Sequence, residues 1–412
     1  MTSGVRSSPQ IPPHAITLPP PHGATSWTND AAVSSPVRRN CLLLAALVAL
    51  VSLLFFSSQN YTVNTFYTPY GFSQWRANWS RRDPVCTERR RVAFVKVHKA
   101  ASTTVTTILQ RFGFSRNLTF ALPPKNDIWH LGFFETLKPE KLSPIPKGKV
   151  YEILCQHVVY SQEAFKKYLP PDIAVIAAVR EPLDRFVSSF LYFHQYPTSV
   201  KQKSTVNGND IMLMREFLKN PEFYEPAVFQ RGSLAVNRMS FDFGIPKSQY
   251  RNASFVDKYI KMVDEHMEFV LVADHFDASL VILKRKLCWS TKDILYKVQH
   301  KGMKQKLAIP EDMRQRLKNL SPSDFQLYDY FSRKFQRIAQ AELNLSEEVS
   351  IFQETLKNVT RFCGGLSKSG PQFKHFEKTQ FSHEFNITKL DCDYLSFKEE
   401  VFIKLLWKNQ AI

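Results

Sequence analysis

A lysine and a run of hydroxyl side chains follow a short apolar segment that begins at Val92. The residues after this segment are Lys96, Val97, His98, Lys99, Ala100, Ala101, Ser102, Thr103 and Thr104. If the segment is a buried strand and a helix follows, the loop between them presents backbone N–H groups and the positive end of a helix dipole, which favour a phosphate. Lys99 adds a full charge there, and the hydroxyls can donate hydrogen bonds or cap the helix. Solvated lysines and hydroxyls that only cap would give the same sequence, so both interpretations stay open.

This loop lacks the glycines of a triphosphate-binding loop. The signature GxxxxGK[ST] is missing, and no glycine occurs between residues 92 and 112. In that signature the glycines let backbone N–H groups approach the phosphates closely. The sequence therefore disfavours a kinase or an NTPase that binds Mg-ATP.

A second group of polar residues lies where another apolar run ends, at Arg180. Pro182 is suited to the first turn of a helix, which would place Ser188 on the second turn. Ligands of open α/β sheets gather at the carboxyl ends of strands, and a guanidinium fork matches phosphate oxygens. Arg180 could instead pair with Glu181 or Asp184 at the start of the helix.

Two further groups could act on a hydroxyl or on a polyanion. His157 comes just after a strand that we expect to end near Leu154, and a histidine there could serve as a general base because its pKa lies near neutral pH. A lone histidine more often has a structural role, and that alternative stays open. The basic stretch 297–306, which contains Lys301 and Lys304, could close over a polyanion or could be a solvated charge run.

Apolar runs and the helices between them would position these groups. The expected strands are residues 92–95, 149–154, 173–179 and 269–273. The expected helices are residues 103–112, residues 183–193 and the apolar stretch that ends at Leu287. Strands that alternate with helices indicate an α/β fold with a mainly parallel central sheet covered by helices on both faces. Residues from about 350 to 395 are less regular, and residues 394–407 have the pattern of one amphipathic helix.

The N-terminal part predicts a membrane anchor. Residues 1–39 are rich in Pro and Ser and have no apolar period, which indicates a disordered cytosolic tail. The uncharged apolar segment at 40–58 is about long enough to cross a thin bilayer as a signal-anchor helix. A buried core helix would show a polar face, and a signal peptide would begin closer to the initiator methionine. Because Arg38 and Arg39 precede the segment, the rest of the chain is expected in the lumen.

Sequons and cysteines agree with a lumenal location. After the anchor we expect a stem at 59–90 and a single domain at 91–412. Asn-x-Ser/Thr triplets occur only after the anchor, at Asn60, Asn78, Asn117, Asn252, Asn319, Asn344, Asn358 and Asn386. The cysteines after the anchor are Cys86, Cys155, Cys288, Cys363 and Cys392. Their odd number leaves at least one thiol free or paired between chains, and we favour a disulfide between Cys363 and Cys392; no spacing resembles a zinc site.

Composition excludes several classes of protein. The chain has 412 residues, with 55 Lys+Arg against 37 Asp+Glu and a formal charge of +18. Its 33 Phe, 15 Tyr and 6 Trp supply ample core material, which excludes disorder throughout. The 13 Gly exclude a collagen-like chain, and the 6 Cys are too few for a disulfide scaffold.

Several colinear motifs resemble those of the Golgi galactose-3-O-sulfotransferase family, which includes the galactosylceramide sulfotransferase. In chain order they are FVKVHKAASTTV, NLTFALP, HLGFF, LCQHVVY, VREPLDRFVSSF, FDFGIP and VLVADHFDASLVILKRKLCW. The likeness extends from about Val92 to at least residue 310. A weaker resemblance to uronyl 2-O-sulfotransferases covers the lysine loop and the surroundings of His157 and Arg180.

The resemblance implies a P-loop-like sulfotransferase fold that uses 3′-phosphoadenylyl sulfate (PAPS) as sulfuryl donor and requires no metal. It assigns the 5′-phosphosulfate to Lys99, Ala100, Ala101, Ser102, Thr103 and Thr104, the 3′-phosphate to Arg180 and Ser188, and further donor contacts to Lys301 and Lys304. His157 would be the catalytic base, Lys99 would also stabilise the leaving phosphate, and His130 would contact the sugar. Ala100 departs from the family pattern, because Thr is common there and one hydroxyl donor is missing. Glu181 also replaces the usual Asp or Asn before the proline.

The resemblance also implies the reaction and its place. The reaction would move a sulfuryl group to the 3-hydroxyl of a terminal β-galactose on a galactosylceramide-like glycolipid or a glycoprotein glycan. The protein would be a single-pass type II Golgi membrane protein of glycolipid biosynthesis, with no nucleic-acid partner; a homodimer stays open. Two alternatives are a lumenal sulfotransferase of the uronyl 2-O type and a non-catalytic, membrane-anchored glycan-binding protein. A glycosyltransferase is disfavoured because no metal-holding carboxylate cluster is evident.

Overall fold

The structure is a computed structural model that describes residues 86–124, 130–206, 208–297, 307–366 and 370–410. The predicted tail, the predicted anchor helix at 40–58 and the predicted stem as far as residue 85 lie outside the described residues. Among the described helices, none combines the length and the apolar character needed to cross a membrane.

The centre of the fold is a parallel sheet of four strands in the order β3-β1-β5-β6. Its strands are β1 (Val92–Val95), β3 (Ile153–Leu154), β5 (Ala174–Val179) and β6 (Phe269–Val272). Neighbouring strands pair in parallel throughout, for example Val92 with Ala174 and Ile176 with Phe269. Apart from Val175, the residues of these strands are buried, as expected for a sheet covered on both faces. The predicted mixed α/β fold with a parallel sheet is therefore confirmed, although β3 begins at Ile153 rather than at residue 149.

A second, two-stranded parallel sheet pairs β2 (His130–Thr136) with β4 (His157–Val159). In its register His130 lies opposite His157. Strand β4 follows β3 after only two residues, so the chain passes directly from the central sheet into the small one. This arrangement places two histidines that are 27 residues apart in the sequence side by side.

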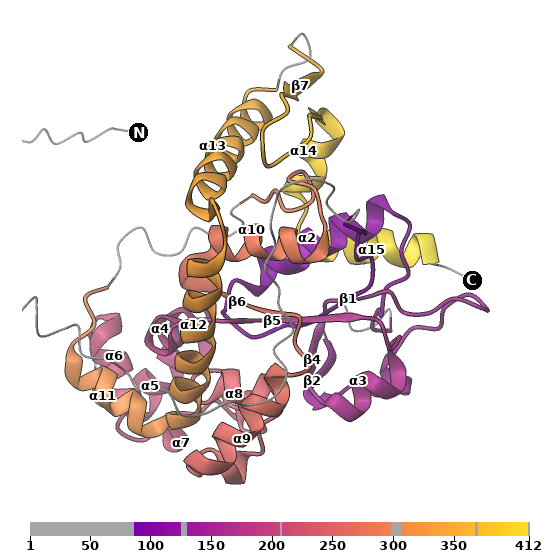
Figure 1. The fold of residues 1–412 in the computed structure, drawn as a ribbon. Helices are drawn as coiled ribbons and strands as arrows, with labels where there is room; N and C mark the ends of the chain where they lie inside the picture. The colour runs from indigo at the N-terminus through magenta and orange to yellow at the C-terminus, as the bar shows by residue number, and fades with distance from the viewer. Residues whose placement is uncertain (1–85, 125–129, 207, 298–306, 367–369, 411–412) are drawn as a thin grey trace, which may run out of the picture. The chain divides into compact units, whose positions relative to one another are not determined.

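Helices cover the central sheet on two sides. Helix α2 (Ser102–Ser115) follows β1, and the apolar period predicted for residues 103–112 matches it. The other helices as far as Ala341 are α3 (Gln162–Tyr168), α4 (Pro182–Tyr192), α5 (Gln195–Lys203), α6 (Asp210–Phe217), α7 (Pro221–Tyr224), α8 (Arg238–Asp242), α9 (Ala253–Asp264), α10 (Phe276–Leu287), α11 (Glu311–Leu320) and α12 (Pro322–Ala341). Short 3-10 helices are η1 (Pro139–Lys141), η2 (Ala227–Phe229), η3 (Lys247–Gln249) and η4 (Ala273–His275). In Figure 1, α2 and α10 lie above the strands, whereas α3, α8 and α9 lie below them.

The C-terminal segment is more regular than its sequence predicts. Helix α13 covers Leu345–Gly364, so the irregular character expected from residue 350 is wrong for this stretch. A hairpin of β7 (Phe373–Phe376) and β8 (Phe385–Thr388) follows. The single helix predicted at 394–407 is two helices, α14 (Lys389–Ser396) and α15 (Glu399–Gln410), because the backbone becomes extended at Phe397.

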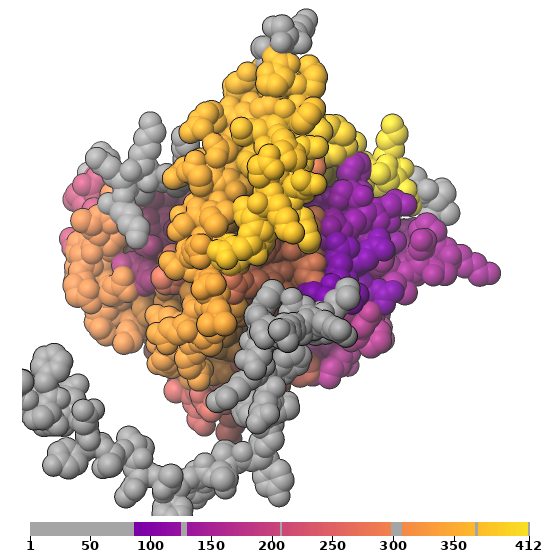
Figure 2. Space-filling view, turned by 45° about the horizontal axis from the view of Figure 1, so that its top comes forward, coloured from indigo at the N-terminus to yellow at the C-terminus, as the bar shows by residue number. Residues whose placement is uncertain are grey.

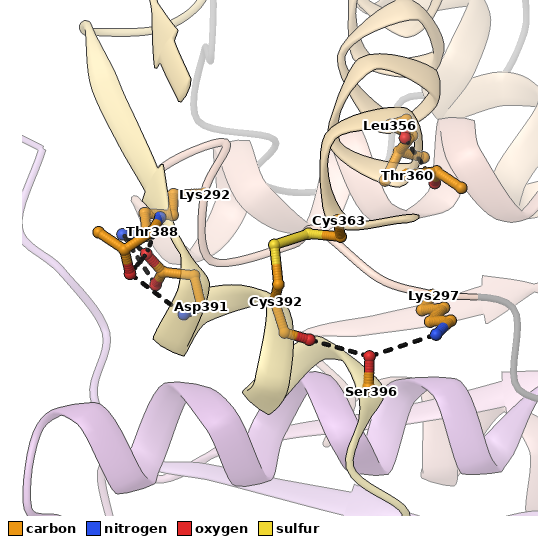
Figure 3. The surroundings of a disulfide bond; sticks show 9 residues. All are labelled: Lys292, Lys297, Leu356, Thr360, Cys363, Thr388, Asp391, Cys392 and Ser396. Carbon is orange, nitrogen blue, oxygen red and sulfur yellow. Dashed lines mark hydrogen bonds and ion pairs between the residues drawn. A yellow bond between two sulfur atoms is a disulfide. The ribbon is translucent and has the colours of Figure 1, made fainter. Parts of the chain in front are cut away.

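Two disulfides stabilise the described chain. Cys363 at the end of α13 is bonded to Cys392 in α14, which confirms the predicted pair, and Figure 3 shows the bond between the two helices. Cys86 is bonded to Cys288, a pair 202 residues apart that the sequence did not reveal. Cys155 is a free, buried thiol, and its burial raises the pKa to about 12. It therefore stays protonated and acts as a core residue.

Candidate active site

The loop between β1 and α2 has an unusual backbone for a segment without glycine. Lys99 and Ala101 both have positive φ, 65° and 58°, and Ala101 is the N-cap of α2. No side-chain hydrogen bond caps this helix, so of the two interpretations left open, the one in which the hydroxyls of Ser102, Thr103 and Thr104 only cap it is not supported. The N–H of Thr104 donates to the Ala101 carbonyl at 3.1 Å, so the Ser102 and Thr103 N–H groups and the dipole of α2 are what the helix directs at a group lying before it.

Lys96 is anchored inside the protein. Its Nζ lies 2.5 Å from Oε2 of Glu399 in α15, and both side chains are almost fully buried. The interpretation of Lys96 as a solvated lysine is therefore wrong. A charge buried in this way needs its partner, so α15 is coupled to the first loop of the site.

Lys99 lies between an aromatic ring and a second cation. Its Nζ is 3.4 Å from the ring centroid of Tyr192, which belongs to α4. Arg180 donates a hydrogen bond from Nη1 to the Lys99 carbonyl, at 3.2 Å. Burial, together with the charges of Arg180 and Arg185, lowers the pKa of Lys99 to about 8. A bound anion would relieve this repulsion between cations.

The structure brings the predicted residues of the second group to the same loop. Arg180 follows β5, and its hydrogen bond goes to the Lys99 loop. Glu181 is occupied elsewhere: its carboxylate accepts from the Asp184 N–H at 2.7 Å and pairs with Arg314 at 2.7 Å. Ser188 is partly buried one turn before Tyr192, so both lie on the same face of α4.

His157 is held with a defined proton arrangement. Its Nδ1 lies 3.0 Å from the Lys96 carbonyl, and a carbonyl can only accept, so Nδ1 carries the proton and Nε2 carries the lone pair. Burial and the neighbouring charges of His98 and Lys96 hold the pKa of His157 well below its usual value. The imidazole is therefore neutral at pH 7 and can accept a proton at Nε2.

Two more histidines surround His157. The His98 ring stacks on it with centroids 3.7 Å apart, and the His130 ring lies 6.0 Å away. His130 also packs edge-on against Phe133, at 4.5 Å. Arg180 and His157 thus contact the loop that carries Lys99, and His130 lies next to His157.

A buried acid–base pair orients His98, and the sequence did not assign it. The backbone N–H of His98 donates to Asp242 Oδ2 at 2.9 Å, and the ring Nδ1 lies 2.9 Å from the same oxygen. Arg238 pairs with Asp242 at 2.8 Å, and both side chains are buried. Asp242 lies within the FDFGIP motif. The motif marked this segment as similar to the family, but it did not indicate the role of Asp242. Residues 144 positions apart leave no local pattern of their contact.

Lys301 and Lys304 lie outside the described residues, whereas Lys297, just before them, donates from Nζ to the Ser396 hydroxyl at 3.2 Å (Figure 3). Within the described ranges, one group of side chains could hold a metal, formed by His375, Glu377 and Glu384. These side chains are exposed on the β7–β8 hairpin, so they belong to other elements than the loop of Lys99.

The arrangement has the parts needed for group transfer to a hydroxyl. Lys99, Arg180 and the first turn of α2 supply positive charge for an anionic donor. Neutral His157 can supply a proton acceptor, and its ring contacts the carbonyl of Lys96, three residues before Lys99 in the chain. Transfer of a sulfuryl or phosphoryl group requires this combination of positioning, charge stabilisation and a base.

Comparison of the sequence with known proteins identifies its family. The sequence profile of the galactose-3-O-sulfotransferase family matches residues 30–375. Galactose-3-O-sulfotransferase 2 of Mus musculus is 30% identical over 281 residues, which are 66% of this chain and 69% of that protein. Galactosylceramide sulfotransferase of Bos taurus is 30% identical over 283 residues, 68% of this chain and 65% of that protein. Since the profile covers most of the chain, the protein belongs to the galactose-3-O-sulfotransferase family of enzymes.

Proposed function

We propose that this enzyme transfers a sulfuryl group from PAPS to the 3-hydroxyl of a terminal β-galactose. Family membership supports a sulfotransferase acting on galactose, and the relatives are named for galactose and for galactosylceramide. The observation that carries the proposal is that the Lys96 carbonyl fixes the Nδ1–H of His157, in the same loop whose Lys99 carbonyl accepts a hydrogen bond from Arg180. The acceptor would be a glycolipid of the galactosylceramide kind or a glycoprotein glycan.

The residues around the loop fit a donor with two anionic ends. Lys99 and the N–H groups at the start of α2 would hold the 5′-phosphosulfate, with Ser102, Thr103 and Thr104 as hydroxyl donors. Arg180 and Ser188, one on each side of the β5–α4 junction, would hold the 3′-phosphate. The lowered pKa of Lys99 supports this assignment, because burial and the charge of Arg180 disfavour its ammonium form and a bound anion would offset both effects.

The chemistry needs one proton acceptor and one stabilised leaving group. The galactose 3-oxygen forms a bond to sulfur while the bond from sulfur to the phosphate oxygen breaks, and 3′-phosphoadenosine 5′-phosphate (PAP) leaves. His157 Nε2 takes the hydroxyl proton, a role that typically contributes about 10²–10⁴ in rate. Lys99 stabilises the charge that develops on the leaving phosphate. His130, opposite His157 in the register of β2 and β4, would contact the sugar.

The location of the enzyme is part of the proposal. Arg38 and Arg39 before the apolar segment 40–58 support a type II signal anchor, with the catalytic residues in the lumen of the Golgi. Described sequons such as Asn117 and Asn386 are exposed, which suits attachment of glycans there. The disulfides also suit an oxidising compartment.

A direct assay tests donor, acceptor and linkage together. The full-length protein is incubated with ³⁵S-labelled PAPS and matched acceptors that carry galactose on ceramide, on an N-glycan or on an O-glycan, and the product linkage is mapped. We expect label on the 3-oxygen of galactose, and loss of about 10²–10⁴ in kcat for His157→Ala. The matched control is His194→Ala, an exposed histidine between α4 and α5. Label on another sugar position, or normal turnover by His157→Ala, would refute the respective assignment.

A further inference from the structure

Lys96 in the β1–α2 loop contacts both Glu399 of the C-terminal helix and the predicted base His157. Its side chain donates from Nζ to Glu399 Oε2 at 2.5 Å. Its backbone carbonyl accepts the Nδ1–H of His157 at 3.0 Å. The same residue thus connects an ion pair with the ring that carries the catalytic lone pair.

Glu399 is itself held firmly. It is 5% exposed at the start of α15, and its carbonyl lies 3.5 Å from the Nε2 donor of Gln110 in α2. At the other end of α15, Gln410 accepts from the Phe120 N–H at 2.6 Å. Figure 2 shows the yellow C-terminal residues next to the indigo residues that begin the described fold. Helix α15 is therefore fixed on the core at both ends.

The segment before Glu399 is covalently fixed as well. Cys392 in α14 is bonded to Cys363 in α13, and Ser396 accepts a hydrogen bond from Lys297 (Figure 3). In each of these contacts one of the two residues lies after position 375, where the match to the family profile ends. The family profile therefore does not cover Glu399.

We propose that Glu399 is a positioning residue that fixes His157 through Lys96, so that the C-terminal helix completes the active site. The inference rests on the proposed function, because it assumes that His157 is the base. Without the carboxylate, the buried Lys96 ammonium would lose its partner and would move toward water or lose its proton. Either change would shift the Lys96 backbone, and with it the carbonyl that orients the imidazole.

A Lys96–Glu399 ion pair that only holds α15 on the core would have the same geometry but a different effect on activity. Its loss would lower the free energy of unfolding, and its effect on kcat would be the same with and without His157. The charged and titratable groups around the His157 ring are Lys96, His98, His130 and Asp242. Lys96 contacts both Glu399, through its side chain, and His157, through its carbonyl. An effect of Glu399 on His157 is therefore expected to pass through Lys96.

The experiment is a double-mutant cycle in the full-length protein, with ³⁵S-PAPS and a galactosyl acceptor. It compares wild type, Glu399→Gln, His157→Ala and the double variant, and Glu400→Gln is the matched control on the next residue of α15. PAP affinity and thermal unfolding are measured on the same samples. If Glu399→Gln fails to fold, Glu399→Asp, which keeps the charge on a shorter side chain, takes its place in the cycle.

We expect Glu399→Gln to lower kcat by about 10-fold to 10²-fold, the effect of a misplaced reacting group, with donor KM and PAP affinity changed by less than about 2-fold. On the His157→Ala background the same substitution should change kcat by less than about 2-fold, since the group it positions is absent. Equal losses in both backgrounds, or an unchanged kcat in the folded variant, would overturn the inference and leave the proposed function intact. If wild type transfers no sulfuryl group, the proposed function fails and the inference fails with it.

Discussion

The two strand-to-helix junctions of the site are built in opposite ways. The junction from β1 to α2 has two residues with positive φ and no side-chain cap, and no acidic residue lies in the first turn of the helix. The junction from β5 to α4 has Pro182 in the first turn and Glu181 as a capping carboxylate. One helix keeps its positive end open, whereas the other has neutralised it with its own side chain.

The difference indicates how each junction would bind an anion. At α2 the backbone N–H groups, the dipole and Lys99 can act together on one group. At α4 the carboxylate of Glu181 occupies that position, so only side chains such as Arg180 and Ser188 are available. This difference supports the proposal that the reacting end of the donor lies at α2 and the non-reacting 3′-phosphate at α4.

The largest effect is expected from removing the charge at the open junction. Lys99→Ala should lower kcat by about 10²–10³, as for loss of one preorganised donor to a developing negative charge. The backbone should tolerate the change, because alanine already occupies position 101 with a similar positive φ. Steady-state sulfuryl transfer measures the effect, and Lys166→Ala, an exposed lysine of α3, is the control. A kcat near wild type would leave the two junctions without a functional difference.

The second prediction uses pH to separate the junctions. The pKa of Lys99 is lowered to about 8, so its charge is present below pH 8 and is lost as the pH rises through that value. PAP affinity should then fall by up to about tenfold per pH unit above the pKa, since the neutral amine of Lys99 no longer attracts the anion. Lys99→Arg should abolish this fall, because a guanidinium stays charged. An equally steep fall in the arginine variant would place the titrating group elsewhere.

Local patterns in the sequence were sufficient to predict the strands and helices that form these two junctions. The apolar runs before Lys96 and Arg180 are strands, and Pro182 begins a helix as predicted. Such features depend on residues close together in the chain, which the hydrophobic period and the cap residues record. The family motifs then grouped Lys99, Arg180 and His157, and the structure places them around one loop.

Contacts between distant residues could not be predicted in this way. Glu399 meets Lys96 across 303 positions, and Asp242 meets His98 across 144. Neither acidic residue differs in its local pattern from a solvated one. The left-handed backbone at Ala101 was also hidden, because such a conformation is normally inferred from glycine.

A smaller effect is expected at the capped junction. Glu181→Ala removes the N-cap of α4 and the pair with Arg314, and it should lower the free energy of unfolding by about 1 kcal/mol. PAP should bind no more weakly than to wild type, because a negative charge next to Arg180 has been removed. Chemical denaturation and PAP titration measure the two quantities. Weaker PAP binding would mean that the carboxylate supports the donor site, and the contrast between the junctions would fail.

The smallest effect concerns the backbone at the open junction. Ala101 has φ 58° and ψ 17°, a left-handed conformation that costs an L-residue about 1–2 kcal/mol and costs glycine little. Glycine also gives the unfolded chain more freedom, worth about 0.4–1 kcal/mol, so Ala101→Gly should raise the free energy of unfolding by up to about 1 kcal/mol. The neighbouring Ala100 is buried and is not among the residues with positive φ, so Ala100→Gly should instead destabilise the protein by about 1 kcal/mol.

The opposite signs at adjacent alanines make this test specific, because a general effect of glycine would have the same sign at both positions. Relief of strain should also make the loop less preorganised, so PAP should bind Ala101→Gly about threefold more weakly although the fold is more stable. Chemical denaturation and PAP titration of both variants measure these changes. If Ala101→Gly loses stability as Ala100→Gly does, the strained backbone is absent and α2 is not held open at the cost of strain. If it gains stability without losing PAP affinity, the strain is present but does not serve binding.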